Sequence, residues 1–438
     1  MSLRKLLVCS FALGAIGWLQ PALHAEEEYE SPPTLRAADV VPADLVQGDH
    51  YKVLPEVSND GFMNTYVIES DYGEFEAQGM SLLKIRAREI GALAQLEELS
   101  KTEVFAKAAL EAGLSPVNAI IDFSQHPIET ITGIPGGIAR MFSRYSRRAK
   151  EGVEQTKELV ASEDEASEAA GAESSEEDEE EQSAATQLTE SYFGVSGAER
   201  NWHQQFGTDP YTSNETLQSA IKSVAWADRL GRFSLRFASL PAVPGADVVG
   251  EASDLVWSKD PYELEDYNRG ILGAAGVDEA LADEFFAQKW LSPSLQTTLI
   301  GALAAMEGVE GREAVVSRAA EVESRAEARL VLESTLLLVG YHESRAPLGR
   351  IFAGRPIPSA IDRDGKAIVA VALDHVVWTE QGEEAAQRYA DMLKDAGAGG
   401  VECWFSGGAS DKARARLEKR LCTVNTNADQ LLVANAED

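Results

Sequence analysis

The sequence predicts an α+β, mostly helical protein, with an N-terminal β-hairpin plus helices, a central helical bundle or short α-solenoid, and a small C-terminal α/β domain. Apolar and polar residues alternate over 62–77, which indicates a half-buried hairpin. Apolar residues recur at steps of three and four through most of 188–345, which is typical of helices. Strand-like and helix-like stretches then alternate to the end of the chain, and this alternation favours an α/β domain.

The first 25 residues have the layout of a secretory signal peptide. Arg4 and Lys5 give a positive start, a mostly apolar run covers 6–19, and small residues lead to Ala25. The run is shorter than the ~20 residues that a membrane-spanning helix needs. We therefore expect cleavage after Ala25 and export to the periplasm or the outside of the cell. Cys9 lies within the apolar run, so it leaves with the signal and does not anchor a lipid.

Five segments follow from composition and pattern. We expect a signal peptide (1–25), an N-terminal hairpin-plus-helices region (26–150), an acidic disordered linker (151–187), a helical domain (188–345) and a small α/β domain (346–438). Residues 161–185 are rich in Asp and Glu over 163–181 and have no large apolar residue, so this stretch cannot bury enough surface to offset the entropy of ordering. Residues 26–50 are acidic and contain proline without a period, and they read as an extended leader.

The N-terminal elements are a hairpin and two helices. Asp71, Tyr72 and Gly73 supply the turn of the hairpin. The helix after it places its apolar residues on one face, namely Leu83, Ala87, Ile90 and Leu93. Ser100 and Glu103 have capping-box spacing and are predicted to open the next helix.

Caps and prolines mark the helices of 188–345. Asn214 is expected to cap a helix whose inward residues are Leu217, Ile221, Val224 and Ala225, with Gly231 after its end. Pro293 stands at a first helical position. Ser324 and Glu327 form a second capping box, ahead of an apolar helix over 330–338. The consecutive helices of 293–340 would stack as a bundle or a short α-solenoid, and the lack of a fixed period excludes a true repeat array.

The last segment alternates between strands and helices. We expect a hairpin of 356–361 and 367–373 around a turn at 362–365, a helix at 383–393, a strand at 401–405, a helix at 411–421 and an extended piece at 422–424. Cys403 and Cys422 are the cysteines left after signal cleavage. An even pair in an oxidising compartment predicts a disulfide, with two buried thiols as the alternative.

A candidate ligand site lies in the loop between the last long strand and the helix after it. Glycines let the backbone approach a ligand there, and the helix start offers N–H groups suited to an anion. The candidate ligand-binding residues are His375, Ser406, Gly407, Gly408 and Ser410. The alternative is a tight turn in which Ser410 or Asp411 caps the helix.

No catalytic residue is predicted. Asp374, His375 and Ser406 could be imagined as a hydrolytic set, but adjacent residues of a strand point to opposite faces. Ser406 also lacks the Gly-x-Ser-x-Gly elbow. The histidines are isolated and no Cys-x-x-Cys spacing occurs, so we expect no metal and no cofactor.

A basic segment at 135–150 contrasts with the acidic remainder of the chain. Its candidate membrane-facing or partner-facing residues are Ile138, Met141, Phe142, Arg144, Tyr145, Arg147 and Arg148. Apolar residues on one side and arginines on the other are typical of a helix lying on anionic lipid. A core-facing helix with a solvated basic face has the same pattern.

Taken with its export signal, the chain is expected to be a soluble envelope protein that acts by protein or membrane-surface interaction. The net charge of -33 excludes nucleic acid as a partner. An acidic surface suited to a saline habitat explains this charge equally well. The alternative function is an enzyme or small-ligand binder with its site at the strand ends of the C-terminal domain. Convergence of Asp374, His375, Glu402 and Ser406 in one pocket would favour that alternative, and a filled surface would favour interaction. The sequence indicates no transmembrane segment after signal cleavage and no particular oligomeric state.

Overall fold

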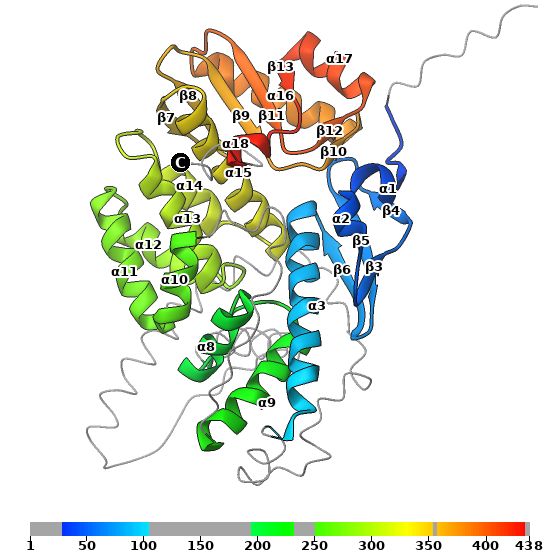
Figure 1. The fold of residues 1–438 in the computed structure, drawn as a ribbon. Helices are drawn as coiled ribbons and strands as arrows, with labels where there is room; N and C mark the ends of the chain where they lie inside the picture. Colours follow the sequence, from blue (N-terminus) through cyan, green and yellow to red (C-terminus); the bar gives the residue numbers. More distant parts are fainter. Residues whose placement is uncertain (1–28, 104, 106–193, 232–249, 354–356, 434–438) are drawn as a thin grey trace, which may run out of the picture.

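A computed structural model describes residues 29–103, 105, 194–231, 250–353 and 357–433 of the chain (Figure 1). An antiparallel sheet comes first, helices occupy the middle, and a mixed sheet lies in the C-terminal part. This arrangement confirms the predicted α+β, mostly helical fold. The segments predicted as a signal peptide (1–25) and an acidic linker (151–187), and the basic segment (135–150), lie outside the described residues.

The N-terminal sheet has the order β1-β4-β5-β3-β2, with β6 added to β5. Its strands are β1 (Thr34–Arg36), β2 (Gln47–Gly48), β3 (Tyr51–Val53), β4 (Glu56–Asn59), β5 (Asn64–Ser70) and β6 (Gly73–Gln78). The predicted hairpin is confirmed, because β5 and β6 are antiparallel with Ser70 opposite Gly73.

The extended leader predicted for 26–50 is wrong over its described part. Two short helices, α1 (Ala37–Val40) and α2 (Ala43–Val46), lie between β1 and β2, and Ala37, Val41 and Leu45 are buried. Elements of so few residues are too short to show a hydrophobic period, and tertiary packing makes them ordered.

Helix α3 (Met80–Ser100) carries the predicted apolar face, and Leu83, Ala87, Ile90 and Leu93 are all buried. The predicted cap of the following helix is shifted by two residues. Ser100 still belongs to α3 and donates its hydroxyl to the Glu97 carbonyl at 2.7 Å. Thr102 takes the capping role instead, since its Oγ1 accepts from the Phe105 amide at 3.2 Å.

The middle of the described chain is helical. Its helices are α8 (Gly197–Phe206), α9 (Glu215–Gly231), α10 (Gly250–Ser258), α11 (Pro261–Ala274), α12 (Glu279–Phe286), α13 (Pro293–Ala305), α14 (Glu313–Ala320) and α15 (Arg325–Ser344). The predicted cap at Asn214 is confirmed, because its Oδ1 accepts from the Leu217 amide. Pro293 is the first residue of α13, as predicted, and Ser292 caps this helix by accepting from the Leu295 amide. The second capping box is half formed. Ser324 accepts from the Glu327 amide, but the Glu327 carboxylate turns to the Glu323 amide and to Arg318.

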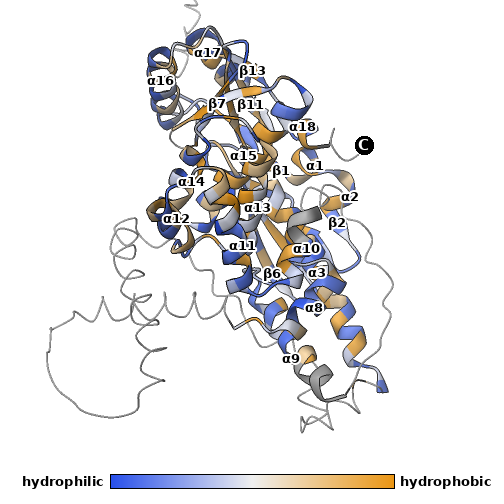
Figure 2. Cartoon of the chain, turned by 90° about the vertical axis from the view of Figure 1, so that its left-hand side faces the viewer, coloured by the Kyte–Doolittle hydropathy of each residue, from blue (hydrophilic) through white to orange (hydrophobic). Residues whose placement is uncertain are grey.

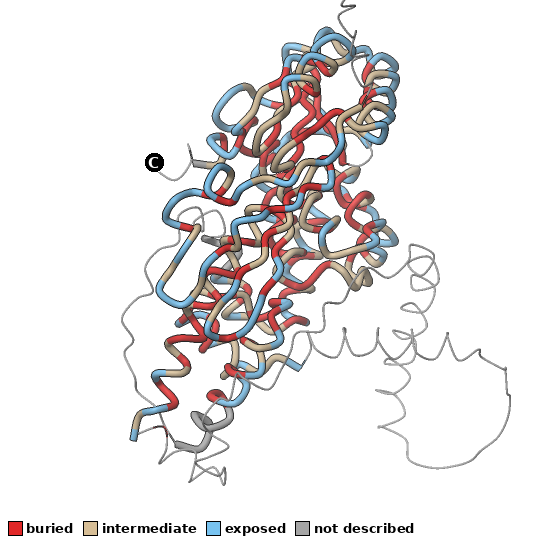
Figure 3. Tube along the Cα trace, turned by 90° about the vertical axis from the view of Figure 1, so that its right-hand side faces the viewer, coloured by how far each residue is buried: buried red, intermediate tan, exposed pale blue. Residues whose placement is uncertain are grey.

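These helices contribute to two large hydrophobic cores. The apolar side chains of α8 and α9 join those of the N-terminal sheet and α3. The apolar side chains of α11 to α15 join those of the C-terminal sheet. Figure 3 shows the buried positions running lengthwise through the molecule, with exposed positions on the outer turns. No helix of the described residues is both long and apolar enough to cross a bilayer.

The C-terminal sheet has the order β13-β11-β9-β8-β7. Its strands are β7 (Leu348–Phe352), β8 (Ser359–Asp362), β9 (Ala367–Val371), β11 (Val401–Phe405) and β13 (Thr423–Asn425). The predicted hairpin is β8–β9, and β9, β11 and β13 run parallel. The strand β7 was not predicted, because Gly349 and Arg350 interrupt its apolar pattern.

Two helices connect the parallel strands, α16 (Glu380–Asp395) and α17 (Asp411–Arg420), both close to the predicted ranges. Figure 2 shows α16 as mostly hydrophilic, with Ala386, Tyr389 and Leu393 as its buried residues. A small sheet pairs β10 (His375–Val376) with β12 (Gly408–Ala409), and α18 (Gln430–Val433) is the last described helix.

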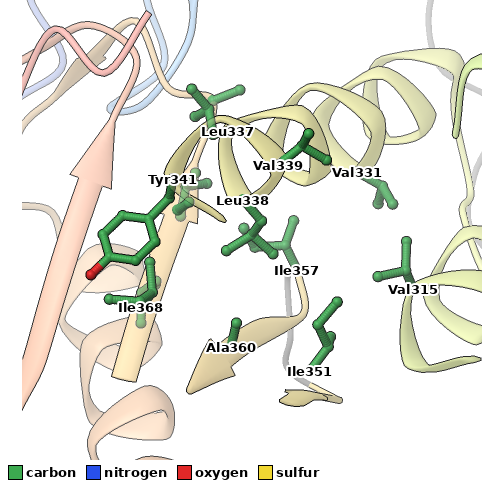
Figure 4. Packing of buried hydrophobic residues seen from close by; sticks show 14 of the residues in the cluster. Val315, Val331, Leu337, Leu338, Val339, Tyr341, Ile351, Ile357, Ala360 and Ile368 are labelled. Carbon is green, nitrogen blue, oxygen red and sulfur yellow. The ribbon is translucent and has the colours of Figure 1, made fainter. Parts of the chain in front are cut away.

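Helix α15 joins the middle helices to the C-terminal sheet. Val331 lies toward Val315 of α14, whereas Tyr341 lies toward Ile368 of β9 (Figure 4). Cys403 of β11 is bonded to Cys422, with Cα atoms 5.8 Å apart, as predicted.

Candidate functional site

The parallel strands of the C-terminal sheet end at one edge, and the segments that follow them meet there. Ligands of α/β proteins bind outside the carboxyl ends of such strands. Residues 373–376 follow β9, residues 406–410 follow β11, and residues 426–429 follow β13. The structure therefore brings the predicted ligand-binding residues to the expected edge of the sheet.

The loop of 406–410 is closed by the protein's own backbone. The Gly407 amide donates to the Leu373 carbonyl at 2.8 Å, and the Gly408 amide donates to the Asp374 carbonyl at 2.9 Å. The Ser406 hydroxyl also donates to the Leu373 carbonyl, at 2.9 Å. A Cβ on Gly407 would lie 1.8 Å from the Asp374 carbonyl oxygen. This glycine thus allows the close approach of two chain segments.

Ser410 caps α17, as in the alternative of a tight turn, because its Oγ accepts from the Ala413 amide. The same hydroxyl donates to the carboxylate of Glu30 at 2.6 Å. The Trp378 amide donates to this Glu30 oxygen at 2.6 Å, and the Glu30 amide donates to the Trp378 carbonyl at 2.7 Å. A segment from the start of the described chain therefore occupies this helix N-terminus.

Asp374 and His375 serve the contact with the N-terminal sheet. The Asp374 carboxylate accepts from the amides of Asn64 (3.0 Å) and Met80 (3.1 Å), and so it binds the start of α3. Burial raises the pKa of Asp374. The His375 amide donates to the Phe62 carbonyl at 3.1 Å, and burial lowers the pKa of its ring.

Glu402 also has partners of its own. Its carboxylate accepts from Lys366 Nζ at 2.7 Å and from Trp404 Nε1 at 3.1 Å. Asp374, His375, Glu402 and Ser406 therefore make separate contacts, and no hydrogen bond joins any two of these side chains within the described residues.

A recess of about 410 Å³ lies at the strand ends of β11 and β13. Its lining residues are Arg345, Trp404, Val424, Asn425, Thr426, Asn427, Ala428, Gln430 and Leu431. They come from the end of α15, from β11, and from the chain that runs from β13 into α18. We refer to this feature as the strand-end recess.

Backbone contacts fix the walls of the strand-end recess. The Asn427 amide donates to the Gly407 carbonyl and the Ala428 amide to the Phe405 carbonyl, both at 2.9 Å. Asn427 has φ of 58°, a left-handed conformation that asparagine tolerates better than most residues. Gly340 lets α15 approach α18, since a Cβ there would lie 2.7 Å from the Leu431 carbonyl oxygen.

A cation and an aromatic ring face each other in this recess. The Arg345 guanidinium lies 5.6 Å from the centre of the Trp404 ring, and the Tyr341 ring meets Trp404 edge-on at 5.8 Å. None of the described carboxylates forms an ion pair with Arg345. Such a site can bind an anion or a planar polar group, and it offers no nucleophile with an adjacent base.

Trp404 belongs to the strand predicted for 401–405, but the sequence analysis identified neither Arg345 nor the segment after β13 as candidate site residues. The polar run Asn425, Thr426 and Asn427 behind a final strand was the available signal. Across 29–433, leaving out the undescribed ranges, no group of three or more His, Cys, Asp or Glu is arranged to hold a metal ion. No protein family model, no curated protein and no solved structure matches this chain.

Proposed function

We propose that this chain is an exported envelope protein that acts by binding a partner protein or a membrane surface, and not by catalysis. The proposal is carried by one observation: the polar side chains at and beside the strand ends are engaged in structural contacts with the rest of the protein. Asp374 binds the start of α3, Ser406 bonds a backbone carbonyl, and Glu402 pairs with Lys366. Groups committed to such structural contacts are not free for general acid or base work.

Export is supported by two features. Residues 1–25 have the layout of a signal peptide. The Cys403–Cys422 disulfide suits the periplasm or the cell exterior, because disulfides persist in oxidising compartments. The test is the mass of the protein recovered outside the cytoplasm. We expect a chain beginning at Glu26, and a Leu13→Arg variant that is retained with its first residues intact. Recovery of full-length wild type from the cytoplasm would contradict the proposal.

The proposed binding to a membrane surface depends on the basic segment at 135–150. Vesicles of anionic lipid should sediment the mature protein, and reversing Arg144, Arg147 and Arg148 to Glu should abolish sedimentation because about 1 kcal/mol per cation is lost. A matched control reverses exposed cations elsewhere, namely Arg363, Arg388 and Lys419, with the same change in net charge. If the control also loses binding, net charge and not this segment decides. If the wild type does not sediment, membrane-surface binding is refuted and binding of a partner protein remains as the proposal.

A second candidate function is favoured by the strand-end recess. Its volume of about 410 Å³ falls within the ~300–1,000 Å³ of small-molecule sites. It also lies at the edge where α/β sheets bind ligands. On this alternative the C-terminal domain binds a small molecule.

A further inference from the structure

The charge of Arg345 is the starting point. The chain carries 72 acidic and 39 basic residues, and Arg345 is one of its cations. Arg345 is exposed at the end of α15, and no described carboxylate pairs with it. The carbonyl end of a helix attracts a cation, but this attraction does not require contact with an aromatic ring. The contact with Trp404 instead places the guanidinium at the wall of the recess.

Trp404 is held in position before any ligand arrives. Its Nε1 donates to Glu402, which is fixed in turn by Lys366. The edge of Tyr341 contacts the ring as well. A ring fixed in this way can contact a ligand with little loss of conformational entropy.

The remaining polar side chains of the recess are neutral. Asn425 donates one amide hydrogen to the Cys403 carbonyl at 3.3 Å, and Thr426 Oγ1 accepts from Arg414 at 3.4 Å. The amides of Asn427 and Gln430 complete the polar lining. Such groups exchange hydrogen bonds with hydroxyl or amide groups of a ligand.

We propose that the strand-end recess binds a small organic carboxylate that also carries hydroxyl or amide groups. The planar fork of Arg345 receives the carboxylate in bidentate fashion, and Trp404 contacts the body of the ligand. Arg345 is the only charged residue among those that line the recess, and one cation balances a monoanion better than a doubly charged phosphate. This inference rests on the small-ligand alternative of the proposed function.

Two pairs of probes test the proposal on the mature protein. One pair is glucuronate and methyl glucoside, and the other is N-acetyl-dialanine with a free carboxylate and its amide. Binding is followed by calorimetry and by tryptophan fluorescence. We expect at least one acid to bind and its neutral partner to bind about ten-fold more weakly or not at all. The pair that binds identifies the source of the carboxylate, a sugar acid or a peptide end.

Variants locate the bound probe. Arg345→Gln should weaken acid binding about ten-fold, and Trp404→Phe should remove the fluorescence change. Arg363→Gln, an exposed arginine of the β8–β9 turn, is the matched control and should bind as the wild type does. Circular dichroism and the thermal midpoint of each variant show that it is folded.

Two outcomes would overturn the proposal in different ways. Equal binding of acid and neutral probes, or wild-type affinity in Arg345→Gln, refutes the carboxylate and leaves a small-ligand site. No binding of any probe by the folded wild type refutes the carboxylate and the small-ligand alternative together. The vesicle and export experiments are independent of this result.

Discussion

His203 should make the protein sensitive to mild acid. Its side chain lies in α8, 2% exposed, with Nδ1 at 2.8 Å from Thr208 Oγ1. Burial lowers its pKa from 6.5 to about 3, because the charged ring would lose its solvation. The folded state therefore keeps the ring neutral at pH values where the unfolded chain protonates it.

The direction and size of the pH effect on the free energy of unfolding follow from this difference in pKa. A depressed histidine pKa leaves stability intact above 6.5 and removes it as the pH falls toward 3. At about pH 5 the unfolded state is favoured by ~2 kcal/mol relative to neutral pH, at 1.36 kcal/mol per pKa unit. The carboxyls of Asp209, Glu333 and Asp374 act in the opposite direction. Burial raises their pKa values, so their protonation favours the folded state as the pH falls.

A comparison of wild type with His203→Asn isolates the histidine. Asparagine keeps a hydrogen-bonding atom near the position of Nδ1 and does not titrate, and the opposing carboxyls are common to both proteins. Urea unfolding at about pH 7.5 and pH 5 gives the free energy of unfolding of each. We expect the wild type to lose ~2 kcal/mol more than the variant between the two pH values. The same loss in both proteins would refute a neutral, buried His203.

Three further predictions concern stability. Reduction of the Cys403–Cys422 bridge should lower the free energy of unfolding by ~3 kcal/mol, because it releases the loop that constrains the unfolded chain; urea midpoints that are equal with and without reductant would argue against it. Gly340→Ala should destabilise by ~1–3 kcal/mol, since its Cβ would meet a backbone oxygen of α18. Gly301→Ala is the matched helical control with open space around it, and it should raise the thermal midpoint because the free energy of unfolding increases by up to ~1 kcal/mol. If both alanine variants are destabilised, the cause is a general effect on the helices and not the contact of Gly340 with α18. Glu30→Ala should lower the free energy of unfolding by ~1–3 kcal/mol and speed hydrogen exchange at the Trp378 amide, which donates to the Glu30 carboxylate. Unchanged exchange at this amide would show that the contact does not hold the segment around Glu30 in place.

The sequence by itself determined the elements whose signals are local. The β5–β6 hairpin has its turn residues beside it, α3 has a long apolar face, and Asn214 caps α9 three residues before the amide that it accepts from. The disulfide also followed from an even cysteine count. For the hairpin, the helix and the cap, the residues that decide the structure are neighbours in the chain or share one period, so a single sequence displays them.

Only the tertiary structure decided which residues meet at the ends of the parallel strands. Glu30 reaches Ser410, a residue 380 positions away, and Asp374 reaches Met80 across 294 positions. The strand-end recess likewise joins Arg345 to Trp404 and to the chain after β13. Local patterns record which residues can form a helix or a strand, but a hydrogen bond between distant segments leaves no period or spacing in the sequence. The loop that looked free for a ligand was therefore filled, and the recess beside it could be found only after folding brought its walls together.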